Sequence, residues 1–375
     1  MIMSTKTLAV GSSALALSAL LAAPAVAGPT YTSDNGGSFR WYGQLNLTYQ
    51  GYDDGQEDYN RLVDNANSGS RVGFWLEQPF GENTLKFRFE TSLSLRGSDG
   101  VNQNGQGDIT DWTRSDLRHV DLQWHTPRYG TFSIGQGSMA ADGVTGIDLS
   151  GTGVVAGSAV ADAAGGYFLR DTAGNLTGIE IGDVFSTFDG SRRGRIRYDS
   201  PEFSGFTVSA SYGEDILTRD ADTQQYDIAL NYMNEDLGDF TVAGALAVSW
   251  TEKGGSEDTR DTIASAAVLH EPTGLSLSAA TGDRDTGGNY GYVKLGYTAN
   301  LISVGSTSFS VDYYDGSDLV STNDSAESFG IAAVQKFDKQ NLEAYIAYRE
   351  YSYDDASATN YQDGSAILAG ARWKF

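Results

Sequence analysis

Three histidines are the side chains of this sequence best suited to acid–base or metal chemistry. They are His119, His125 and His270, and the first two share one face of an alternating segment with Asp121 and Gln123. Such a set could bind a metal or activate a nucleophile. No serine stands in a G-x-S-x-G nucleophile elbow, however, and a histidine on a wet polar face is usually a lining residue. We therefore expect neither a catalytic site nor a metal site here.

A glycine-rich stretch matches a nucleotide-binding fingerprint. Residues 135–140, GQGSMA, follow a strand-like segment and fit the pattern G-x-G-x-x-A. That fingerprint requires a helix immediately afterwards, because the amides of the helix bind the pyrophosphate. Glycines at 143, 146, 151, 153 and 157 interrupt the residues that follow and argue against a helix. We expect no nucleotide site.

Pairs of acidic residues stand in several polar stretches, where their oxygens could hold Ca²⁺. None has the spacing and the glycine of a dedicated calcium loop. We expect no cofactor beyond weak Ca²⁺ binding at such acids, which otherwise solvate loops or bridge weakly to lipopolysaccharide through divalent ions. The pairs are Asp53/Asp54, Asp220/Asp222, Asp283/Asp285 and Asp354/Asp355.

The first 27 residues have the pattern of a secretory signal peptide. A cationic start is followed by an Ala/Leu-rich run over 8–23 and an A-x-A site at 25–27. The expected mature chain, 28–375, has no run of about eighteen apolar residues, which excludes a helical inner-membrane protein. Cysteine is absent, so disulfides and thiol chemistry are excluded. The net charge of −24 argues against a nucleic acid partner.

Segments that alternate between apolar and polar residues recur throughout the mature chain. In the clearest, 84–96, Leu85, Phe87 and Phe89 alternate with Lys86 and Arg88, a period of two. Sixteen such segments can be counted. The links between them alternate between short turns, such as 79–83 and 127–130, and long polar loops, such as 51–68 and 97–110. Short turns at one end and long loops at the other are the layout of an outer-membrane barrel.

A soluble β-sandwich and a β-helix are the alternatives, since periodicity alone does not separate a sandwich from a barrel. No β-helix repeat is visible. Aromatic residues at strand ends, the alternating loop lengths and charges in mid-strand favour the barrel. We predict an all-β fold, a single sixteen-stranded antiparallel transmembrane β-barrel. The mid-strand charges are Lys86, Arg88, Glu90, Asp121, Lys294 and Asp312.

Several features together resemble the trimeric general diffusion porins of Gram-negative outer membranes, especially the purple-bacterial type. They are the signal peptide, the opening strand FRWYGQL at 39–45, the long loop at 135–189 after the fifth strand, and the ending ARWKF at 371–375. The order of these segments and the C-terminal Phe375 carry the resemblance, which covers the whole mature chain. It implies that the loop 135–189 folds into the barrel and narrows it, and that Phe375 is an assembly signal.

The resemblance also implies that cations on the first strands face acids of the loop across a narrow water path. A Gly-rich loop can lie inside a barrel, because wall side chains and water satisfy its backbone. The candidate wall cations are Arg40, Arg71, Lys86, Arg88, Arg193, Arg195 and Arg197, and the candidate loop acids are Asp142, Asp148, Asp162, Glu180 and Asp183.

The predicted function is that of an outer-membrane porin, not an enzyme, through which small hydrophilic solutes and ions diffuse passively. The implied partners are two further copies in a homotrimer, the lipid bilayer, lipopolysaccharide and the outer-membrane assembly machinery. Two alternatives stay open. One is a substrate-selective outer-membrane channel, although no aromatic slide is obvious in the long loop. The other is a secreted acidic β-protein, such as an adhesin or a surface-layer subunit.

Overall fold

The computed structural model describes residues 28–255 and 257–375. The expected signal peptide, 1–27, lies outside the described residues. Within them, no helix has the length and apolarity needed to cross a membrane.

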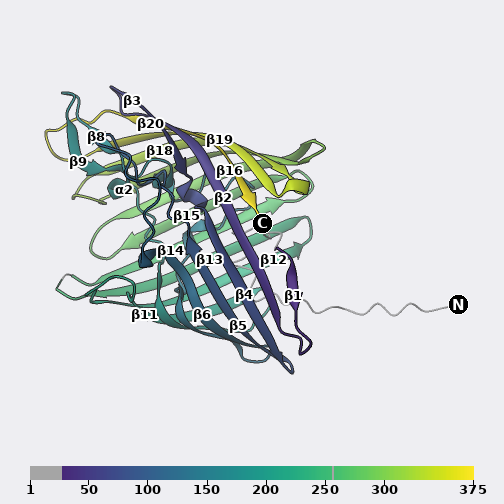
Figure 1. Cartoon of the computed structure of the whole chain (residues 1–375). Helices are drawn as coiled ribbons and strands as arrows, with labels where there is room; N and C mark the ends of the chain where they lie inside the picture. The colour runs from purple at the N-terminus through teal and green to yellow at the C-terminus, as the bar shows by residue number, and fades with distance from the viewer. Residues whose placement is uncertain (1–27, 256) are drawn as a thin grey trace.

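Sixteen antiparallel strands close into a barrel (Figure 1), which confirms the predicted fold class. The same sheet also contains two short strands, β1 (Thr30–Thr32) and β3 (Asp58–Asp64), which pair with β2. The barrel strands are β2 (Ser38–Asp53), β4 (Arg71–Phe80), β5 (Asn83–Ser92), β6 (Leu117–Thr126), β7 (Gly130–Ser138), β10 (Arg192–Asp199), β11 (Phe206–Glu214), β12 (Thr223–Leu237), β13 (Phe240–Lys253), β14 (Thr259–His270), β15 (Leu275–Arg284), β16 (Asn289–Ile302), β17 (Gly305–Ser317), β18 (Ser325–Phe337), β19 (Leu342–Asp354) and β20 (Gly364–Lys374).

The first and last strands close the barrel. β2 pairs with β4 through residues 38–44 and with β20 through residues 44–53. The terminal Phe375 exchanges two backbone hydrogen bonds with Gly43, at 3.0 and 2.8 Å. A Cβ at position 43 would lie 2.6 Å from the Phe375 ring, so this close approach requires glycine. The closing position of Phe375 agrees with its expected place in the last strand, and its role as an assembly signal stays a prediction.

Residues along each strand face two different media. On β16, Tyr292 and Lys294 point into the barrel and are 6% and 1% exposed. Val293 and Leu295 point outward and are 44% and 56% exposed. This period of two produces a polar inner wall and an apolar outer surface, which is the arrangement of a barrel that lies in a membrane.

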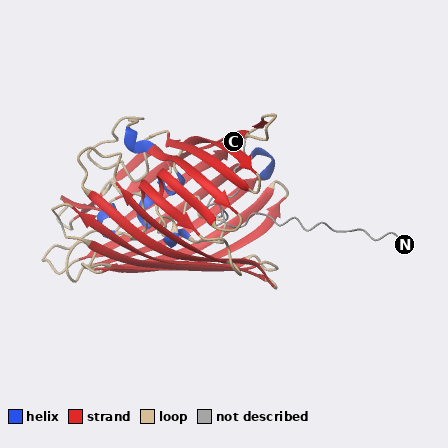
Figure 2. Cartoon of the chain, turned by 90° about the horizontal axis from the view of Figure 1, so that it is seen from below, coloured by secondary structure: helices blue, strands red, loops and turns tan. Residues whose placement is uncertain are grey.

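The connections after the odd-numbered barrel strands are mostly longer than those after the even-numbered ones, as predicted, although 285–288 is as short as 271–274. Figure 2 shows that the helical segments are short. The short connections include 81–82, 127–129, 238–239 and 303–304. The long ones include 54–70, 93–116, 139–191 and 355–363. The short 3₁₀ turns are η1 (Ala66–Ser68), η2 (Arg114–Asp116), η3 (Val144–Gly146), η4 (Val160–Ala163) and η5 (Asp338–Gln340).

The longest connection joins β7 to β10, the fifth and sixth barrel strands, and it spans 139–191 rather than the predicted 135–189. Residues 135–138 belong to β7, since Gly135 and Gly137 pair with Arg195 and Arg193 of β10. A Cβ at Gly135 would lie 2.3 Å from the Val120 carbonyl oxygen, so its glycine permits a close strand contact. The connection also has secondary structure that its composition did not indicate: η3, η4, a hairpin of β8 (Phe168–Arg170) and β9 (Leu176–Glu180), and the one-turn helix α2 (Ile181–Val184).

Candidate functional site

Three arginines share one buried carboxylate on the inner wall formed by β4, β5 and β6. Nitrogens of Arg118, Arg88 and Arg71 lie 2.6, 2.9 and 3.9 Å from the carboxylate oxygens of Glu90. The Glu90 side chain is 2% exposed, whereas the three arginine side chains are 19–28% exposed. Tyr42 donates a further hydrogen bond to Glu90 at 2.9 Å. Three positive charges against one negative charge leave this part of the lumen positive where water reaches it.

A β-bulge brings Arg118 into this cluster. His119 faces the lumen, so strict alternation would point Arg118 outward. The register between β5 and β6 shifts between the pairs Glu90↔His119 and Thr91↔Leu117, which leaves Arg118 as the extra residue. Nothing in the amino-acid pattern marks this bulge, and Arg118 is therefore absent from the predicted wall residues.

All seven predicted wall cations lie on the lumen side of their strands. Their effect on solutes stays a prediction. Their neighbours differ: Arg71 and Arg88 share Glu90, Lys86 lies 3.9 Å from Glu77, Arg195 lies 2.9 Å from Asp121, Arg197 lies 2.7 Å from Asp199, Arg40 is in register with Trp75, and Arg193 is in register with Gly137.

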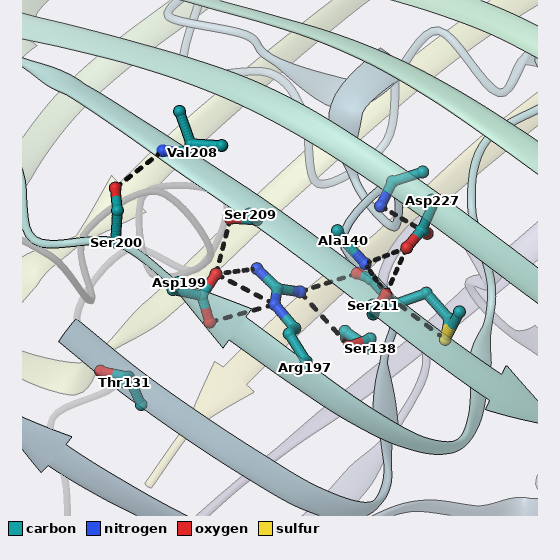
Figure 3. Close-up of polar contacts among 12 residues, drawn as sticks. Thr131, Ser138, Ala140, Arg197, Asp199, Ser200, Val208, Ser209, Ser211 and Asp227 are labelled. Atoms are coloured by element: carbon teal, nitrogen blue, oxygen red, sulfur yellow. Dashed lines mark hydrogen bonds and ion pairs between the residues drawn. The ribbon is translucent and has the colours of Figure 1, made fainter. Parts of the chain in front are cut away.

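The connection 139–191 begins with its backbone fixed to the inner wall (Figure 3). Asp227 on β12 accepts hydrogen bonds from the amides of Ala140 and Ala141, at 3.2 and 2.9 Å. Arg197 on β10 donates to the Met139 carbonyl at 2.7 Å. Wall side chains thus satisfy backbone groups that the irregular segment would otherwise leave unpaired.

Further contacts place the middle of the connection inside the barrel. They come from lumen-facing side chains of β2, β14, β17 and β19, strands that are far apart in the sequence. The contacts are Gln50 Nε2 to the Ala163 carbonyl at 2.7 Å, the Ser265 hydroxyl to the Val144 carbonyl, Thr152 Oγ1 to Ser310 Oγ at 2.8 Å, and the Tyr351 hydroxyl to the Val160 carbonyl at 2.8 Å.

Two of the predicted acids form ion pairs with cations that the sequence reasoning did not assign to them. Asp142 lies 3.5 Å from Arg192 of β10. Asp148 lies 2.7 Å from Lys294 of β16, on the opposite wall from Arg71 and Arg88. Burial alone would raise the pKa of Asp148, but the ammonium of Lys294 holds that pKa below its usual range. Asp148 is therefore ionised and locally balanced.

The pKa values of two other acids of the connection are shifted in the opposite direction, upward. Burial raises the pKa of Asp162 to about 7, and the neighbouring Asp99 adds to the effect. Burial raises the pKa of Asp189 to about 6, and Asp142 adds to the effect. Asp99, on the connection 93–116, is exposed and is missing from the predicted set. Carboxylates with such pKa values change the charge of the lumen near neutral pH.

Residues 168–184 of the connection lie at the mouth formed by the long loops, where Figure 1 shows β8, β9 and α2 gathered. Arg170 of β8 lies 2.6 Å from Asp54, and their side chains are 8% and 1% exposed. The Gln362 amide donates to the Arg170 carbonyl at 2.8 Å. Of the remaining predicted acids, Glu180 is the N-cap of α2 and Asp183 lies within that helix, where it accepts a hydrogen bond from the Glu180 amide at 3.0 Å.

The residues considered for other chemistry have ordinary polar surroundings. His119 and His125 both lie on the lumen face of β6, as predicted, and Nδ1 of His125 is 3.0 Å from the Thr131 hydroxyl. Within 28–255 and 257–375, no three His, Cys, Asp or Glu side chains are arranged to hold a metal ion. Asp54, one of the proposed calcium acids, is occupied by Arg170. Weak Ca²⁺ binding stays a prediction.

Comparison with known proteins gives a consistent assignment. A model of the Gram-negative porin family matches residues 12–356. No curated protein sequence matches the chain significantly.

Three of the similar solved structures illustrate the likeness in fold. An anion-selective porin from Comamonas acidovorans is 18% identical, with a TM-score of 0.60 over 90% of this chain and 100% of that chain. OprB of Pseudomonas putida is 9% identical, with a TM-score of 0.62 over 90% and 94%. OmpT of Vibrio cholerae, described in a trimer form, is 15% identical, with a TM-score of 0.53 over 90% and 99%.

The family match covers most of the chain, and the barrel, its polar lumen and its apolar outer surface fit that family. The alternative of a secreted adhesin or surface-layer subunit is not favoured, nor is that of a substrate-selective channel. The chain belongs to the Gram-negative porin family, whose members are outer-membrane channels for passive diffusion.

Proposed function

We propose that the narrowest part of this channel lies between the connection 139–191 and the arginine wall around Glu90. The observation that carries the proposal is the inward placement of the connection, whose carbonyls at Val144, Val160 and Ala163 accept hydrogen bonds from wall side chains. A segment fixed there reduces the free cross-section of the lumen. Small hydrophilic solutes and ions pass beside it, and larger solutes are excluded.

The charges on the two sides of this gap support a transverse electric field. Arg71, Arg88 and Arg118 with their shared Glu90 carry two net positive charges on one side. Asp162 lies on the connection, with the exposed Asp99 near it. At an effective dielectric constant near 20, two unit charges about 4 Å apart interact by roughly 4 kcal/mol, so such groups can influence ions in the pore.

The proposed assembly is a homotrimer in the outer membrane, in contact with lipopolysaccharide and delivered by the outer-membrane assembly machinery. The trimer form of the Vibrio cholerae protein supports this proposal. So does the outward-facing aromatic cluster on the first strands, in which Phe39 and Trp41 of β2 pack against Phe74 of β4. An apolar surface of this kind suits contact with lipid or with a neighbouring copy.

The channel is proposed to act without a catalytic step or a tightly held cofactor, which is how the family's members work. Transport then depends on size and charge alone.

Planar-bilayer recording tests the proposed function. Folded, heat-modifiable protein extracted in detergent should insert and raise the current in uniform steps. Liposomes that contain it should admit small sugars and exclude large oligosaccharides. Folded protein that repeatedly fails to produce current steps would overturn the proposal.

A further inference from the structure

A lysine in the wall of β16 is buried beneath the connection 139–191. Its side chain is 1% exposed. Nζ of Lys294 lies 2.7 Å from Oδ2 of Asp148 and 2.5 Å from the Ala156 carbonyl oxygen. The two partners lie on either side of the turn 149–155, so a single ammonium group holds both ends of that turn against the wall.

The contact is almost dry. The cavity beside it has a volume of about 10 Å³ and is lined by Asp148, Tyr292 and Lys294 among others. That volume is about the minimum for one water molecule. The Asp148 side chain is 12% exposed, so water reaches only the edge of the pair. Removal of either charge would leave the other largely buried without compensation, which is the costly way to break an ion pair.

The neighbouring wall acid does not compete for the lysine. Asp312 of β17 stands opposite Lys294 in the register of the sheet. Its carboxylate is bonded instead to Arg349 of β19 at 2.7 Å, and the side chains of that pair are 0% and 6% exposed. The charge of Lys294 is therefore matched by Asp148 alone, and the wall is neutral at this place.

The other hydrogen bonds between this part of the connection and the wall join uncharged groups. Thr152 and Ser310 join their hydroxyl groups at 2.8 Å, and the Ser150 carbonyl accepts a hydrogen bond from Thr298 at 3.1 Å. Neutral hydrogen bonds of this kind contribute less than a charge-assisted one in a dry site.

We infer that Lys294 is the positioning residue that holds the connection 139–191 open against the wall, and that its pairing removes Asp148 from the charges that act on passing ions. The inference rests on the proposed function, since it concerns the segment that narrows the channel. It differs from the sequence-based expectation that Asp148 faces the water path. The loss of this pair should make the connection mobile without changing the preference of the pore for cations or anions.

The test compares Lys294→Met, Asp148→Asn and the double variant in single-channel recordings. Each single variant should show closing events about tenfold more often than the natural protein, because it leaves an unpaired charge beneath the connection. The double variant should return most of the way to the natural frequency. The reversal potential under a salt gradient should stay unchanged in the double variant.

Glu343→Gln is the matched control. Glu343 is paired with Arg372 at 2.6 Å and with Lys374 at 3.2 Å, and these ion pairs join β19 to β20. This variant removes a buried carboxylate whose ion pairs join two strands of the wall, and it should not raise the closing frequency. If Lys294→Met does not fold, Asp148→Asn carries the test, since Asp148 belongs to no barrel strand.

Three results would overturn the inference while the natural protein still conducts. The single variants could close no more often than the natural protein, the double variant could close more often than either single variant, or Glu343→Gln could close as often as they do. A shift of the reversal potential in the double variant would also overturn it. Absence of current from the natural protein would instead refute the proposed function.

Discussion

Two parts of the inner wall carry buried or half-buried cations, but they use them differently. On β4–β6, Arg71, Arg88 and Arg118 crowd around one carboxylate and remain 19–28% exposed. On β16 and β19, the side chains of Lys294 and Arg349 are 1% and 6% exposed, and each has an acid of its own. The first wall is open to water and carries net charge, whereas the second is covered by the connection and is neutral.

A charge on the lumen side of a strand therefore has one of two roles. Where charge is in excess and water reaches it, the side chain can act on solutes. Where each charge is matched and water is excluded, the pair fixes one part of the protein to another. Facing alone, which is what a period of two predicts, does not distinguish the roles.

The largest effect, a loss of stability, is expected when a charged side chain is placed on the outer, lipid-facing surface. Leu295, next to Lys294 on β16, is 56% exposed on the outer surface. Leu295→Arg should destabilise the barrel by about 2–4 kcal/mol, the cost of a charge in the middle of a membrane. Arg88→Gln on the open wall should cost far less. Both variants would be unfolded in denaturant, and the folded fraction would be followed by the heat-modifiable mobility of the barrel on a gel. An equal loss of stability in both would mean that the inner and outer faces are wrongly assigned.

Shortening the connection 139–191, which lies over the neutral wall, should enlarge the pore. Deletion of residues 151–166 takes away the middle of the connection, including the carbonyls bonded to Gln50 and Tyr351. Because conductance follows the free cross-section, the single-channel conductance should rise roughly twofold. An unchanged conductance in a folded variant would place the connection outside the ion path.

Removing the shared carboxylate should make the open wall more positive and more selective for anions. Glu90→Gln leaves three arginines without their common acid and raises the net charge there by one. An ion about 4 Å away in water feels a unit charge by roughly 1 kcal/mol, so the local concentration of anions should rise about fivefold and the anion-to-cation ratio should rise with it. Reversal potentials measure this ratio. Glu77→Gln, beside Lys86 on the same wall, serves as a comparison farther from the cluster.

A smaller effect is expected from pH. The pKa of Asp162 is raised to about 7 by burial and by Asp99, so the folded protein holds this proton more tightly than the unfolded chain does. As pH falls through 7 the carboxylate is neutralised, which favours the fold and removes a negative charge from the connection. Cation preference should therefore fall between pH 8 and pH 6 in the natural protein. Asp162→Asn should abolish that part of the pH dependence, and a persistent change in this variant would assign it to another group.

The sequence predicts most of the barrel because a strand that separates two media repeats with a period of two. The same period is the basis on which Lys86, Arg88 and the ladder of Arg193, Arg195 and Arg197 are predicted to face the lumen. Arg118 is missed because one extra residue in a bulge reverses the alternation.

The path of the connection 139–191 was less accessible to prediction. It has no period, and its contacts join residues distant in the chain, such as Asp148 and Lys294, which are 146 positions apart. Glycines that belong to the end of β7 also look like the start of a loop, which explains the misplaced boundary at 135.

Reversal potentials of variants in the two walls show whether only the open wall acts on passing ions. The pair to compare is Arg118→Gln, on the open wall, with the double variant Lys294→Met and Asp148→Asn, on the covered wall. Both would be recorded in planar bilayers under the same salt gradient. Arg118→Gln should shift the reversal potential toward cation preference, and the double variant should leave it unchanged. Equal shifts in both, or a shift in the double variant alone, would contradict the division of the lumen into an open charged wall and a covered neutral one.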